Sequence, residues 1–105
     1  MNENKIQEMQ ILEQRLQNSL LQKQAFQMEL AETNSAMNEL EKSGDDVFKI
    51  IGQLMIKSEK SKIKDELENK QKILEMRIKS FDKQEEIIND QLGKMQEELI
   101  NSGKK

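Results

Sequence analysis

A seven-residue repeat of apolar side chains occupies both ends of the chain. Seven of ten repeat positions are apolar near the N-terminus, and eight of ten are apolar near the C-terminus. The N-terminal series is Met9, Leu12, Leu16, Ser19, Lys23, Phe26, Leu30, Thr33, Met37 and Leu40. The C-terminal series is Leu67, Gln71, Leu74, Ile78, Phe81, Glu85, Ile88, Leu92, Met95 and Leu99. Such spacing is typical of long α-helices that bury one stripe against a partner helix.

The composition also favours long helices over a globular core. Proline is absent from the 105 residues, 35% of them are charged, and the three aromatic residues are all phenylalanine. We predict helices over 5–42 and 61–101, with Ser61 capping the second helix and Gly103 just beyond its end. The two stripes suit either an antiparallel coiled coil within one chain or a rod between chains, because a heptad repeat does not show which chain supplies the partner helix.

Polar residues interrupt both stripes. Ser19, Lys23 and Thr33 weaken the first stripe in its middle, where polar groups fix register at some cost in stability. Glu85 falls on the second stripe, and we expect it to pair with a Lys or Arg of the first helix. Gly93 lies inside the second helical pattern and predicts local softness there.

The segment between the predicted helices has the pattern of a β-hairpin. Ser43-Gly44-Asp45-Asp46 predicts a helix end followed by a turn. Two β-branched runs, VFKII and LMIK, then flank Gly52-Gln53, and glycine first in a two-residue connection suits a type II′ turn. We predict a hairpin over 47–57 in which Ile51 pairs with Leu54.

This hairpin carries apolar groups on both faces and has two open edges. A lone two-stranded ribbon is marginally stable in water, so something must cover it. The segment could be an apolar turn packed on the helix ends or a continuation of the helix; we favour an assembly element that closes a sheet or barrel with hairpins of sister chains. The predicted assembly residues are Val47, Phe48, Ile50, Ile51, Gly52, Leu54, Met55 and Ile56.

Residues for catalysis and cofactor binding are largely missing. The sequence has no His, Cys, Tyr or Trp, and its four glycines do not form a phosphate-binding loop. Adjacent acids such as Glu85 and Glu86 point about 100° apart on a helix and cannot close on one substrate. We therefore expect a protein that is not an enzyme and binds no metal, nucleotide or other cofactor.

Charge and hydropathy limit the partners. A net charge of −3 without a basic run predicts no nucleic-acid binding, and no apolar segment approaches a membrane span. The N-terminal residues lack the pattern of a signal peptide, so we expect a cytoplasmic location.

The free ends of the two helices carry more apolar residues than one helix pair can bury. Ile6, Ile11 and Ile100 fall off the stripe, and methionine suits surfaces that bind partners of varied shape. Scattered surface apolar residues are common and are the alternative explanation. The candidate binding residues are Ile6, Met9, Ile11, Leu12, Leu16, Leu92, Met95, Leu99 and Ile100.

The first predicted helix is followed by the segment VFKIIGQLMIKSEK and then by a helix carrying LENKQKILEMRIKSFDKQEEIINDQL. This order resembles the β-type subunits of prefoldin over essentially the whole chain, 1–105 as one domain. Unlike many relatives, the sequence has no proline near the first strand. The resemblance implies a mainly α fold, an antiparallel coiled coil joined by a hairpin that assembles into an inter-subunit β-barrel.

The same resemblance implies a hexamer of two α-type and four β-type subunits. It further implies an ATP-independent chaperone that holds non-native polypeptides at the coiled-coil tips and passes them to a group II chaperonin. A structural coiled-coil tether or scaffold with one fixed partner is the alternative function, although a tether has no use for an exposed β-ribbon at its bend.

Overall fold

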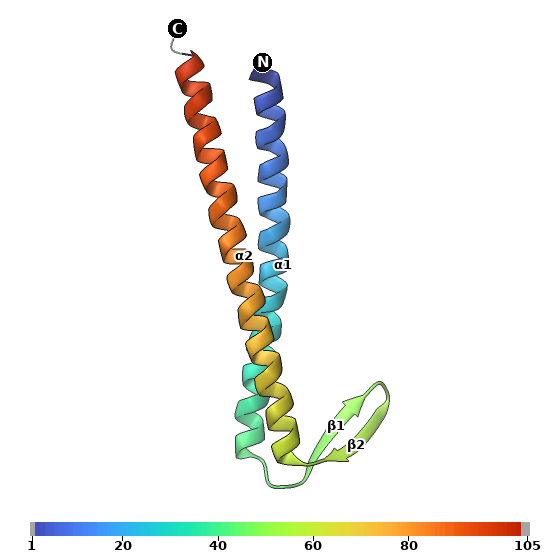
Figure 1. Cartoon of the computed structure of the whole chain (residues 1–105). Helices are drawn as coiled ribbons and strands as arrows, with labels where there is room; N and C mark the ends of the chain where they lie inside the picture. Colours follow the sequence, from blue (N-terminus) through green and yellow to red (C-terminus); the bar gives the residue numbers. More distant parts are fainter. Residues whose placement is uncertain (1, 104–105) are drawn as a thin grey trace. The chain divides into compact units, whose positions relative to one another are not determined.

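The computed structural model describes residues 2–103, which form two long helices and one β-hairpin (Figure 1). In chain order the elements are α1 (Asn2–Lys42), β1 (Val47–Ile51), β2 (Leu54–Ser58) and α2 (Lys60–Gly103). The contacts divide into two compact units. We call residues 2–25 with 77–103 the free-end unit, and Phe26–Met76, which contains the hairpin, the hairpin unit.

The buried side chains of both helices follow the heptad repeat. All ten predicted stripe positions of α1 and all ten of α2 are buried or partly buried, whereas nearly every other helical position is exposed. Leu74 in the hairpin unit is the most buried apolar side chain, and Leu92 is the most buried one in the free-end unit. The repeat therefore marks the contact stripe of each helix.

Within the free-end unit the two helices pair in antiparallel fashion. Lys5 Nζ lies 2.7 Å from Glu98 Oε2, and Ser19 Oγ donates a 3.2 Å hydrogen bond to Gln84 Oε1. Partner numbers in α2 fall as those in α1 rise, which is the mark of antiparallel pairing. The partner stripe thus belongs to the same chain in this unit.

The hairpin unit shows the same pairing independently. Gln71 Nε2 donates a 2.8 Å hydrogen bond to Asn34 Oδ1, and Lys60 Nζ donates one of 2.8 Å to the carbonyl of Ser43. The second bond places the Lys60 ammonium at the C-terminal end of α1. Helix carbonyls lack partners there, and a cation is favourable.

Three of the four helix ends differ from the sequence prediction. The C-terminal end of α1 lies at Lys42, where Ser43 Oγ donates a 2.8 Å hydrogen bond to the carbonyl of Leu40. The prediction of Ser61 as a cap was wrong, because α2 begins at Lys60 and the carbonyl of Glu59 accepts its first bonds. Strand β2 runs to Ser58, which leaves only Glu59 as a connection. Gly103 belongs to α2 and does not lie beyond it.

The hairpin has the predicted register and turn. Ile51 pairs with Leu54 and Ile50 with Met55, so helical continuation is excluded. Gly52 has φ of +60°, and no other described residue has positive φ. Positive φ at the first turn residue alone is the type II′ geometry, which matches the right-handed twist of the strands.

Candidate functional site

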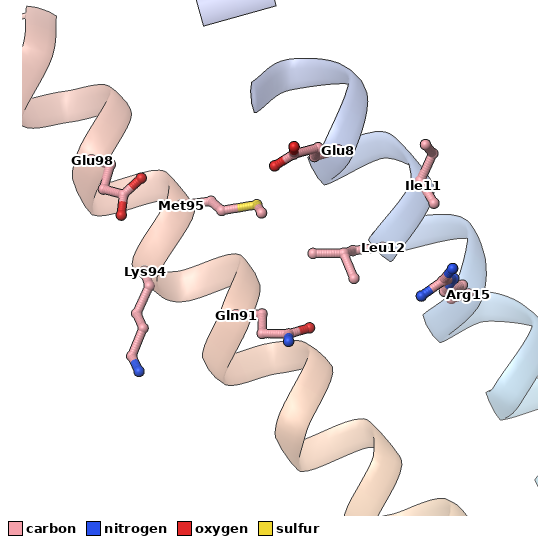
Figure 2. Close-up of a pocket in the computed structure, with 8 residues that line it drawn as sticks. All are labelled: Glu8, Ile11, Leu12, Arg15, Gln91, Lys94, Met95 and Glu98. Carbon is pink, nitrogen blue, oxygen red and sulfur yellow. The ribbon is translucent and has the colours of Figure 1, made fainter. Parts of the chain in front are cut away.

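A groove runs between the two helices of the free-end unit. Its first part is a cavity of about 450 Å³, in which Leu12 of α1 and Met95 of α2 point toward each other (Figure 2). The lining residues of this part are Glu8, Ile11, Leu12, Arg15, Gln91, Lys94, Met95 and Glu98. The stripe is therefore only partly closed here, and seam side chains form the floor of the groove.

The groove continues along the same side of the helix pair. A second cavity of about 500 Å³ shares Leu12, Arg15 and Gln91 with the first. The residues added in this part are Asn18, Ser19, Gln22, Gln84, Ile87 and Ile88. An apolar floor thus extends over several helical turns, with charged residues around the first part and mainly amide side chains around the second.

The predicted binding residues differ in the exposure of their side chains. Ile6, Ile11 and Ile100, which lie off the stripe, are 46–58% exposed. The other candidates are partly buried stripe residues (Met9, Leu12, Leu16, Met95 and Leu99), except Leu92, which is buried. Of the whole set, the groove brings together Ile11, Leu12 and Met95. Their contact with a bound polypeptide stays a prediction.

Sequence reasoning missed two features of this site. Ile87 is as exposed as Ile100 and lines the groove, yet it was not among the candidates. Its position off the stripe, next to Ile88, is the same signal that identified Ile11. The amide walls formed by Gln22, Gln84 and their neighbours carried no recognisable signal in a glutamine-rich helix.

A polar layer crosses the helix pair beside the second part of the groove. The Lys23 ammonium lies 2.5 Å from Asp82 Oδ1 and 3.1 Å from Glu85 Oε1. Hydrogen bonds to Asp82 and then Glu85 raise the pKa of Lys23 above its usual value. The expected partner of Glu85 in the first helix is thereby confirmed as Lys23, whereas the contribution of Asp82 was not foreseen.

The buried hydroxyls of the α1 stripe are also satisfied. Thr33 is buried and its Oγ1 donates a 2.8 Å bond to the carbonyl of Glu29, one turn earlier in the same helix. Ser19, also buried, bonds Gln84 as described above. Because a buried polar group without a partner is costly, these bonds allow hydroxyls at stripe positions.

The β-hairpin is a second candidate binding surface. Val47 is buried, and Lys49 Nζ lies 3.0 Å from Glu66 Oε2 of α2, which ties the start of the hairpin to the helix. Beyond this attachment six large apolar side chains are at least 45% exposed: Phe48, Ile50, Ile51, Leu54, Met55 and Ile56. A dense apolar surface on a two-stranded ribbon is typical of an interface.

The part of the chain that the structure describes shows neither a metal site nor a membrane span. Over residues 2–103, no three acidic side chains come close enough together to hold a metal ion. In the same part of the chain, neither helix has an apolar stretch of the length and hydropathy needed to cross a membrane.

Paired helices, a groove with an apolar floor and an apolar β-hairpin define a helical protein equipped to bind other polypeptides. The chain belongs to the prefoldin subunit family, whose sequence pattern matches residues 3–104. It is 34% identical over 102 residues to prefoldin subunit beta of Methanothrix thermoacetophila, covering 95% of this chain and 85% of the relative. It is 36% identical over 86 residues to prefoldin subunit beta of Pyrobaculum calidifontis, covering 80% and 69%.

A solved structure gives the same result. The crystal structure of the prefoldin beta subunit from Thermococcus strain KS-1 matches with a TM-score of 0.90 and 31% identity, covering 96% of this chain and 90% of that one. The predicted fold class, two long helices joined by a hairpin of the kind that forms a barrel between subunits, is confirmed. Family membership supports a prefoldin chaperone role and assembly with other prefoldin subunits.

Proposed function

We propose that this chain is a β-type chaperone subunit that binds non-native polypeptides at the free-end unit, prevents their aggregation and delivers them to a group II chaperonin. Two observations carry client binding: Ile6, Ile11 and Ile100 of the free-end unit are exposed, and the same unit has a groove with an apolar floor whose lining includes Ile11. Apolar surface of this kind contributes about 25 cal/mol per Å² when a client covers it. Such contacts require no fixed shape in the client.

The proposed assembly is a hexamer of two α-type and four β-type subunits held together through the hairpins. The exposed apolar residues on both hairpin faces support this proposal, because a single chain leaves them in water. Several free-end units would then act on one client. Many weak contacts give strong retention in total while each remains readily reversible.

The proposed protein acts in the cytoplasm, and residues 1–105 form one domain. It works without nucleotide and has no membrane or nucleic-acid partner. The sequence supports independence from nucleotide because its glycines form no phosphate-binding loop. Client transfer to the chaperonin rests on membership in the prefoldin family alone.

The test replaces the exposed isoleucines Ile6, Ile11 and Ile100 with Ser in the chain co-expressed with an α-type prefoldin subunit. We expect loss of aggregation suppression on a chemically denatured client, measured by light scattering, with hexamer mass and helical circular dichroism retained. The three side chains lie outside the contact stripe, so their removal leaves helix pairing intact.

A matched control replaces Met28, Ile73 and Met76 with Ser. These residues are equally large, are also exposed and lie on the helices of the hairpin unit. Protection by the control and loss of protection in the free-end variant would support the proposed site. Full protection by the free-end variant would refute it.

A further inference from the structure

The second part of the groove combines an apolar floor with amide walls. Its floor includes the stripe residues Leu12 and Ile88, and the exposed Ile87 adds an apolar side chain beside them. Its walls carry Asn18 and Gln22 from α1 with Gln84 and Gln91 from α2. Arg15 is the one charged side chain in this lining. A surface that only collected apolar side chains would gain nothing from a row of amides.

These amides have hydrogen-bonding capacity to spare. Among residues 2–103, the side chains of Asn18, Gln22 and Gln91 make no hydrogen bond. The amide oxygen of Gln84 accepts a hydrogen bond from Ser19, and its NH₂ group makes none in this part of the chain. Figure 2 shows Gln91 pointing across the groove toward α1. Each amide offers two N–H donors and a carbonyl acceptor, so each can bond either group of a peptide backbone.

An extended polypeptide matches both features of the groove. Its side chains alternate between two faces, so every second side chain can reach the floor while backbone N–H and C=O groups face the walls. From Gln84 to Glu98 the groove follows fifteen residues of α2, a length of about 21 Å at a rise of ~1.5 Å per residue. This length holds about six extended residues at ~3.3 Å each.

We propose that the groove binds the unpaired backbone of an extended client segment through these amides, while its floor takes alternate apolar side chains. The inference rests on the proposed function and adds the chemical feature by which a non-native chain is recognised. A helix or a paired strand has already satisfied its backbone groups, so the amides discriminate against folded segments. Backbone groups are common to all sequences, so recognition depends on conformation and not on sequence.

The decisive variant is Gln22→Met with Gln91→Met. Methionine has nearly the size of glutamine, is flexible and enlarges the apolar surface of the groove. If the groove only collected apolar side chains, the variant would bind clients as tightly as the parent or more tightly. If the amides bond the backbone, we expect roughly tenfold weaker binding from the loss of two or more hydrogen bonds.

The matched control is Gln17→Met with Gln96→Met. Both glutamines are exposed, lie on the same two helices in the free-end unit and do not line the groove. Binding of a permanently unfolded client, such as reduced and carboxymethylated lactalbumin, is measured by fluorescence anisotropy with the complex containing the α-type subunit. The control should bind with the affinity of the parent.

A peptide probe tests the same contact from the other side. A short fluorescent peptide of alternating leucine and serine is compared with its analogue N-methylated at the serines, which keeps the leucine side chains but removes backbone donors. We expect the analogue to bind the parent roughly tenfold more weakly and to lose most of this difference with the Gln22→Met, Gln91→Met variant.

The outcomes separate this inference from the proposed function. Parent protein that protects clients, together with a methionine variant that binds equally well or better, would overturn the backbone contact and leave the chaperone role standing. Parent protein that fails to bind any unfolded client would overturn both. Weaker binding by the groove variant alone, with an unchanged control, supports the inference.

Discussion

The substitution Ile50→Asp tests whether the hairpin is the assembly surface. Ile50 is 69% exposed and lies opposite Met55 in the strand register. Alternation along the strands places Phe48 on the same face of the ribbon. A sister hairpin that covers this face would bury all three side chains, so a carboxylate at position 50 would lie inside the interface.

The expected penalty has two parts. The interface loses the burial of an isoleucine, worth about 1.5–3 kcal/mol, and an unpaired carboxylate held away from water costs several kcal/mol more. A total above about 4 kcal/mol weakens association by roughly a thousandfold, because each ~1.4 kcal/mol is a factor of ten. A complex of small interfaces should not survive this loss at micromolar concentration.

Size-exclusion chromatography with light scattering, after co-expression with an α-type subunit, measures the mass of the complex. The control is Ile73→Asp, the same substitution at a 52% exposed isoleucine of α2 in the hairpin unit. Circular dichroism should remain helical for both variants. An Ile50→Asp complex of unchanged mass would refute the assignment of the hairpin to assembly.

Three further predictions concern energy input, ionisation and packing. Client capture by the purified complex should be the same with ATP, ADP or no nucleotide, and a reproducible ATP effect in the anisotropy assay would reveal a nucleotide site. Hydrogen bonds to Asp82 and Glu85 raise the pKa of Lys23, so the stabilising effect of its ammonium should be present below the usual lysine pKa of about 10.5 and disappear as pH rises through the raised pKa. Lys23→Met should lose this alkaline pH dependence of the free energy of unfolding in urea, and an unchanged dependence would contradict the prediction. Leu74→Ala should reduce the free energy of unfolding by about 2–5 kcal/mol, whereas Met76→Ala on the exposed side should change it by less than about 0.5 kcal/mol; equal effects would contradict the stripe.

The helices, stripes and hairpin register were predictable because local rules determine them. A stripe needs only the helical period, and Gly52 fixes both the turn and the pairing of Ile51 with Leu54. The start of α2 was misplaced because Ser61 is the better capping residue, yet pairing of the strands extends to Ser58 and brings the helix forward to Lys60. Here sheet hydrogen bonds outweighed a local capping preference.

The candidate groove was predictable only in part. Off-stripe exposure of Ile11 follows from its position in the repeat, but the side of the helix pair on which a groove opens depends on how α1 and α2 rotate against each other. That rotation brings Gln22 and Gln91 to the lining of one groove although they lie in different helices. The heptad repeat of one helix does not indicate which off-stripe residues of the other helix line the same groove.

The polar layer and the groove have a common physical origin in the free-end unit. Polar residues at stripe positions, such as Lys23 and Glu85, give up apolar contact and specify register through paired charges. Farther along the same unit, Leu12 and Met95 remain only partly buried, so each belongs to the seam and to the groove floor. A stripe of leucine throughout would strengthen helix pairing, but closer pairing would bury this floor. A seam that draws its specificity from ion pairs can therefore leave apolar surface open to a client without losing its register.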